Sequence, residues 1–109
     1  MKEVFEMGKK ITIKRKKQFA AAAIKCFVAL NLEINEFDHA SEKVFTLTNG
    51  RTIVLETTAE KNSFFIVAFT SAGKVFSEIV VVDEHDHDAK YFVAFKMGIL
   101  RNKFDIDKM

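Results

Sequence analysis

The chain has no proline and no tryptophan, one cysteine, one tyrosine and four glycines. A single cysteine excludes a disulfide framework, because it has no partner within the chain. No apolar run is longer than six residues, whereas a helix needs roughly 20 to span a bilayer. No two glycines are closer than 23 residues, which excludes a glycine-rich loop that could hold a phosphate.

The sequence is instead rich in apolar residues. It has 109 residues, of which 49% are hydrophobic and 29% are charged. This composition excludes intrinsic disorder, and the length predicts one domain over residues 1–109. No apolar export segment is visible in the first 18 residues, and with one cysteine we expect a whole small protein of the reducing cytoplasm.

The charge is unevenly placed along the chain. Residues 1–17 contain seven Lys or Arg against two Glu, a net charge of +5, whereas residues 18–109 contain ten basic and thirteen acidic residues, a net charge of −3. A basic N-terminal segment is typical either of a solvated first strand or of a surface that binds nucleic acid or anionic lipid. The candidate residues for anion or nucleic-acid binding are Lys14, Arg15, Lys16 and Lys17.

Strand-like segments recur about every ten residues, with turn residues between them. This spacing predicts an all-β protein, an antiparallel β-sandwich of about seven to eight strands. The expected strands are Lys10–Lys14, Ile24–Asn35, Val44–Thr48, Thr52–Thr57, Ser63–Thr70, Lys74–Val82, Tyr91–Met97 and Lys103–Ile106.

Two of these segments carry further information. Asn49-Gly50 lies between two strand-like segments and predicts a hairpin with a type I′ turn, because both central residues of that turn need positive φ. Phe64–Phe69 is apolar at every position, so it predicts a central strand covered on both faces.

The segment Lys16–Asn35 has two interpretations. The four alanines Ala20–Ala23 favour a helix, which would give an α+β protein with an N-terminal helix over residues 16–31 packed on an antiparallel sheet. The alternation of apolar and other residues from Ile24 to Asn35 favours a strand, and we prefer it. If the helix were present, a pocket for a small ligand would form between helix and sheet.

The order of motifs resembles the small bacterial immunoglobulin-like β-sandwich domains related to the PEGA type. The residues that carry the resemblance are Ile11-Thr-Ile-Lys-Arg15, Phe19, Lys25–Asn31, Phe45-Thr-Leu-Thr-Asn-Gly50 and Tyr91-Phe-Val-Ala-Phe-Lys-Met-Gly98. The chain departs from the pattern at Asn31-Leu32-Glu33, where a glycine turn is expected, and at Glu60-Lys61-Asn62-Ser63. The resemblance implies a non-catalytic binding or spacer module.

Few residues are arranged for chemistry. His85 and His87 in the acidic segment Asp83–Asp88 are candidate metal ligands, but no third His or Cys lies near them in sequence. Cys26 lies on the apolar side of its predicted strand, where a thiol behaves as a small hydrophobe. We therefore expect no catalytic residue, no metal and no cofactor, and a protein that is not an enzyme.

The twelve phenylalanines predict a core or a subunit interface more than a stacking surface for nucleic acid, because Trp is absent and Tyr occurs once. The surplus apolar side chains predict a protein partner or a homodimer. The candidate interface residues are Val80, Val82, Phe92 and Phe95. The preferred hypothesis is a β-sandwich interaction module, with nucleic-acid or anionic-surface binding as the alternative.

Overall fold

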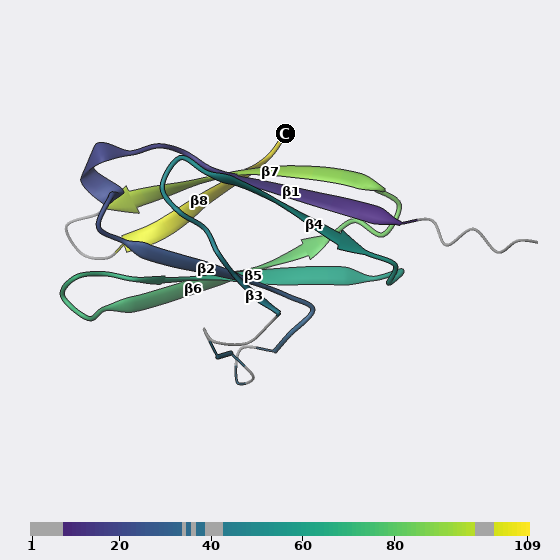
Figure 1. Cartoon of the computed structure of the whole chain (residues 1–109), viewed down its shortest axis with the longest axis horizontal. Helices are drawn as coiled ribbons and strands as arrows, with labels where there is room; N and C mark the ends of the chain where they lie inside the picture. Colours follow the sequence, from purple (N-terminus) through teal and green to yellow (C-terminus); the bar gives the residue numbers. More distant parts are fainter. Residues whose placement is uncertain (1–7, 34, 36, 39–42, 98–101) are drawn as a thin grey trace, which may run out of the picture.

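Two four-stranded sheets pack face to face in the computed structural model of the chain (Figure 1). The structure describes residues 8–97 except 34, 36 and 39–42, and residues 102–109. The described strands are β1 (Lys9–Arg15), β2 (Lys25–Leu30), β3 (Val44–Thr46), β4 (Thr52–Thr57), β5 (Asn62–Phe69), β6 (Val75–Val82), β7 (Asp88–Met97) and β8 (Asn102–Lys108).

These strands confirm the predicted all-β sandwich. The alternative with a helix over residues 16–31 is wrong, because those residues contain only one short helical turn, η1 (Phe19–Ala21), followed by strand β2. The four alanines favour helix locally, but a helix gains most of its stability from packing an apolar face, and here only Ala21 of this turn is buried. No helix in the described residues is long and apolar enough to cross a membrane.

The strand order is β4-β1-β7-β8 in one sheet, called sheet A here, and β3-β2-β5-β6 in the other, called sheet B. All pairs are antiparallel except β1 and β7, which run parallel with Lys10 opposite Asp88. The first strand therefore lies inside sheet A, between strands that come much later in the sequence.

Strand β2 is shorter than predicted and ends at Leu30, not at Asn35. Asn31 has a φ of 54°, in the left-handed region that Asn tolerates better than most residues, and this conformation breaks the pleat of the strand. Its side-chain Oδ1 accepts a hydrogen bond from the Ser63 amide at 2.9 Å, and its Nδ2 donates to Asn62 Oδ1 at 2.8 Å. Asn31 thus takes the conformation expected of a turn glycine.

The hairpin predicted at Asn49-Gly50 is also wrong. The strands on either side of the turn belong to different sheets, since β3 pairs with β2 and β4 pairs with β1. Only Gly50 has positive φ (76°), and Asn49 does not, so the type I′ requirement is not met. Instead, the Asn49 side chain accepts a hydrogen bond from the Gln18 amide at 3.0 Å, which holds the turn against the end of β1.

The main core lies between the two sheets. Ile11, Ile13 and Val93 of sheet A face Val28, Phe64 and Ile66 of sheet B in one buried cluster. Phe64 meets Tyr91 edge-on with ring centroids 5.2 Å apart, and Phe76 packs against Phe104 at 4.8 Å. These contacts confirm that phenylalanines build the core of the sandwich.

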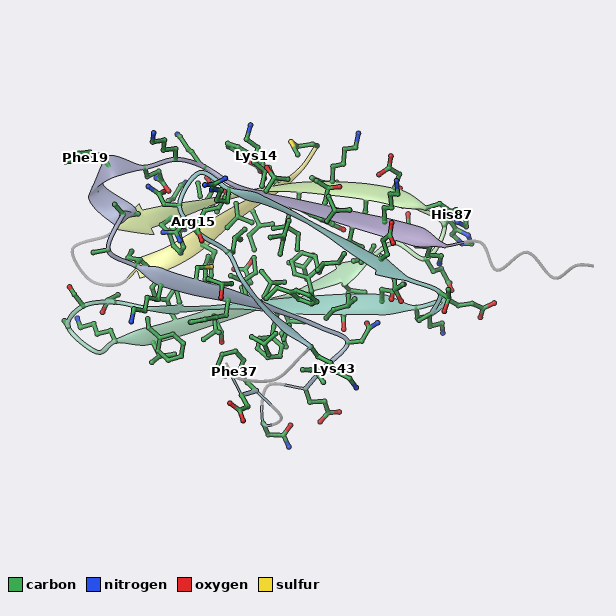
Figure 2. All side chains as sticks on the ribbon, in the orientation of Figure 1. Lys14, Arg15, Phe19, Phe37, Lys43 and His87 are labelled. Atoms are coloured by element: carbon green, nitrogen blue, oxygen red, sulfur yellow. The ribbon has the colours of Figure 1, made fainter. Side chains whose placement is uncertain are left out.

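A second apolar cluster lies on the outer face of sheet B. Phe65, Val67 and Ala29 are buried there, and Leu32 and Phe37 of the loop between β2 and β3 pack against them. Phe37 of that loop contacts Phe65 at a centroid distance of 5.7 Å and Phe27 at 6.1 Å, and its side chain lies on the outer side of the sheet (Figure 2). Strand β5 is therefore covered on both faces, as its apolar sequence predicted.

Candidate functional site

The basic segment does not present all of its charges to solvent. Lys14, Lys16 and Lys17 are exposed, but Arg15 is 1% exposed and points between the sheets (Figure 2). Side chains alternate along β1, so Lys14 faces outward and Arg15 takes the same inward side as Ile11 and Ile13. The prediction that Arg15 is a surface contact for an anion is therefore wrong. Residues 1–7 of the basic segment lie outside the described residues.

Arg15 is instead a structural residue. Its Nη1 donates to the carbonyl of Leu47 at 2.8 Å, and its Nη2 donates to those of Ala21 at 2.8 Å and Ile24 at 3.0 Å. The guanidinium also lies over the Phe95 ring, 4.8 Å from its centroid. The Nε atom is buried and has no hydrogen-bond partner among the described residues. The Arg15 side chain thus connects three segments to the core: η1, the residue before β2 and the residue after β3.

Cys26 faces the same interior and is 1% exposed. Burial raises the pKa of its thiol from an ordinary value of 9.0 to about 12, and the nearby charge of Arg15 opposes this only in part. A thiol with a raised pKa is a poor nucleophile at neutral pH, so this geometry does not support chemistry at Cys26.

This raised pKa predicts that stability falls in alkali. In the native state the thiol keeps its proton up to about pH 12, whereas the unfolded thiol ionises near pH 9. The native state therefore binds more protons in this window, and the contribution is complete below pH 9 and is lost as the pH rises toward 12. Urea unfolding over this range should show a smaller decline for Cys26→Ala than for the parent chain. Parallel declines in the two proteins would contradict the assignment.

The two candidate metal ligands lie in the turn between β6 and β7. His85, His87 and Lys9 line one shallow hollow, and His87 is placed at one end of the sandwich (Figure 2). The Lys9 ammonium donates to the carbonyl of Glu84 at 2.7 Å, so a positive charge already occupies this hollow. In the described part of the chain, no group of three or more His, Cys, Asp or Glu could hold a metal ion.

The carboxylates of this turn have local partners. Asp83 accepts a hydrogen bond from the His85 amide at 2.9 Å, and Asp86 accepts one from the Asp88 amide at 3.1 Å. Asp86 also forms an ion pair with Lys108 at 2.8 Å, which lowers the pKa of Asp86. The acidic residues thus shape the turn and connect it to β8.

The predicted interface residues lie mostly inside the molecule. Val82 and Phe95 are buried, and Val80 and Phe92 are partly buried. The exposed apolar side chains of β6 have the opposite parity: Val75, Ile79 and Val81 are 57%, 61% and 78% exposed. The sequence could not show which alternate residues of β6 face the core, because Ile79–Val82 is apolar at every position and two adjacent registers fit it equally.

Strand β6 is also an edge of sheet B. In the described part of the chain its sole hydrogen-bonding neighbour is β5. In this pair, Ile79 of β6 lies opposite Phe65 of β5. Its second edge offers backbone amides and carbonyls for strand pairing, and natural proteins commonly block such edges with lysine, proline or a bulge. The one charged residue of β6 is Glu78, on the other face from Ile79.

Comparisons with known proteins add little to this geometry. No protein-family model matches the chain, and no curated protein matches it. A crystal structure of the human-specific toxin intermedilysin is similar over 94% of the chain, with 8% sequence identity and a TM-score of 0.47. The chain corresponds to 23% of the length of that toxin chain. The resemblance to PEGA-type domains stays a prediction.

Proposed function

We propose that this protein is a non-catalytic interaction module that pairs with a second copy of itself through the edge strand β6. The observation that carries the proposal is the row of Val75, Ile79 and Val81, each more than half exposed on one face of an unpaired edge. Large apolar side chains gathered on an accessible surface are typical of interaction sites.

The composition of β6 favours a copy of the same strand as the partner. Two antiparallel copies related by a twofold axis would present the same residues to each other. With Ile79 opposite its own copy, Glu78 faces Val80 of the partner strand and not the other Glu78, so this register avoids a like-charge pair. The pairing would extend sheet B across both subunits and bring the two rows of Val75, Ile79 and Val81 into contact side by side on one face.

We expect the chain to be a dimer in sedimentation equilibrium and Ile79→Lys to be a monomer under the same conditions. A lysine at this position places a charge in the centre of the paired edge, which opposes strand addition. Val54→Lys is the matched control, because Val54 is a 55% exposed valine on β4, an edge strand of the other sheet. It should leave the dimer intact.

A parent chain that stays monomeric at the highest soluble concentration would refute self-association through β6. So would a dimer that Ile79→Lys leaves unchanged. Dissociation of both lysine variants would assign the effect to added charge in general and would equally refute the β6 interface.

A second candidate function is binding of nucleic acid or another polyanion. The observation that favours it is the exposure of Lys14, Lys16 and Lys17. Arg51 is also exposed and lies next to this segment, because its carbonyl accepts a hydrogen bond from the Arg15 amide at 2.9 Å. No ion pair of these four side chains is present among the described residues.

We expect retention on a heparin column at low salt to be lost in Lys14→Glu/Lys16→Glu/Lys17→Glu, because polyanion binding depends on the number of cationic contacts. Arg15 is left unchanged so that the fold is not disturbed. A matched control reverses Lys61, Lys74 and Lys103, which are exposed elsewhere on the molecule. Equal elution of the two triple variants, or no retention of the parent, would contradict this function.

A further inference from the structure

A hollow of about 530 Å³ opens on the outer face of sheet B, at the start of β2. Its volume lies in the range of small-ligand sites. It is lined by Ala23, Lys25, Phe27, Phe69, Thr70 and Ser71. The first residues of β2 and the end of β5 meet here, because Lys25 lies opposite Phe69 in the register.

The walls of this hollow are aromatic. Phe27 and Phe69 are partly exposed and meet edge-on, with ring centroids 5.8 Å apart. Phe69 also contacts Phe37 at 6.2 Å, so the ring is held from the other side. Partly exposed rings fixed in this way offer a preformed surface on which a flat apolar group can pack.

The polar groups of the hollow favour an anion. Lys25 is exposed, and no ion pair of its ammonium is present among the described residues. Thr70 Oγ1 accepts the Lys74 amide at 3.0 Å, which leaves the hydroxyl proton available to a ligand. None of the lining residues is acidic.

The surroundings of the hollow strengthen this preference. A second hollow shares Ala23, Lys25 and Phe27 with the first and is also lined by Arg15. The described residues place no carboxylate in contact with Arg15, whose guanidinium meets only carbonyls and the Phe95 ring. Arg15 is buried between the sheets and its donors are used on these carbonyls, so the direct contact with an anion in the outer hollow is assigned to Lys25. Lys25 is also the one charged residue among the strand positions that share the outer face with Phe65.

We infer that this hollow binds a small amphipathic carboxylate, with its aromatic or aliphatic body between Phe27 and Phe69 and its anionic group at Lys25. Charge complementarity selects the anion, and the aromatic walls select the apolar body. The hollow shares the outer face of sheet B with β6, whose Val75 lies opposite Phe69 in the register. Its lining residues come from β2, the end of β5 and the segments next to them, and none comes from β6. The site is therefore complete in one copy of the chain.

Titration of ¹⁵N-labelled protein with 2-naphthoate, followed by amide chemical shifts, tests this inference. We expect the largest shifts at Lys25, Phe69 and Ser71, and weaker binding of 2-naphthylmethylammonium, which has the same ring and the opposite charge. Lys25→Glu should weaken naphthoate binding about five- to tenfold, because an exposed ion pair is replaced by repulsion. Lys61→Glu, at an exposed site just before β5 and outside this hollow, should leave binding unchanged.

Three results would overturn the inference. One is the absence of shifts up to the solubility limit of naphthoate, and another is a set of shifts centred elsewhere on the molecule. The third is equal affinity for the anionic and cationic probes, or for the parent and Lys25→Glu. Amide spectra of both variants without ligand show whether each is folded, and Lys25→Gln replaces Lys25→Glu if the latter is not.

Discussion

Replacement of Arg15 by methionine is expected to lower the free energy of unfolding by about 3–5 kcal/mol. Methionine fills a similar volume but donates no hydrogen bond, so the carbonyls of Leu47 and Ile24 would lose the donor that Arg15 provides, and the carbonyl of Ala21 would keep only the Ile24 amide. Each buried carbonyl left unsatisfied costs about 1–3 kcal/mol. Equilibrium unfolding in urea measures the loss.

Lys14→Met is the matched control for this substitution. Lys14 is the preceding residue of the same strand but is exposed, so its replacement should change stability by less than about 0.5 kcal/mol. Arg15→Lys should recover only part of the stability, because one ammonium cannot reproduce the planar fork that serves three carbonyls. A loss below about 1 kcal/mol in Arg15→Met would contradict the structural role given to Arg15.

Phe65→Ala is expected to destabilise the protein by about 3–5 kcal/mol, as much as truncation of a phenylalanine in a main core. Phe65 is 1% exposed, although it lies on the outer face of sheet B and not between the sheets. The substitution removes its contact with Phe37 and leaves a cavity under the loop between β2 and β3. Thermal or urea unfolding, followed by circular dichroism, gives the difference.

The same substitution at a different site provides the comparison. Phe19 is 100% exposed and points away from the sandwich (Figure 2), so Phe19→Ala should be neutral within about 0.5 kcal/mol. Equal small effects of the two substitutions would mean that the outer cluster is not a second core. Equal large effects would mean that Phe19 is covered in solution.

The fold was predictable where sequence patterns act locally. The alternation of apolar and polar residues predicted β1. The apolar residues at all positions of Phe64–Phe69 predicted that β5 is buried on both faces. The errors at Asn31 and Asn49-Gly50 have a tertiary origin. Leu47 is fully buried and Arg15 holds its carbonyl, so the chain leaves sheet B there and enters sheet A without forming a hairpin.

The candidate sites were less predictable for the same reason. A basic run gives no indication of which side chain turns inward, so Arg15 could be separated from Lys14 and Lys16 only by counting parity from the buried isoleucines of β1. The hollow beside Lys25 joins the start of β2 to the end of β5, whose residues are more than 40 positions apart. Spacing along the sequence carries no signal for such a contact.

The position of β1 has a consequence for how the chain folds. This strand is in the interior of sheet A, where one of its neighbours is β7, and Lys10 pairs with Asp88. Sheet A cannot be completed until β7 and β8 have been synthesised, and closing so long a loop is entropically costly and slow. Strand β1 must wait for β7, so sheet A forms as a single cooperative unit and not progressively from β1 onward.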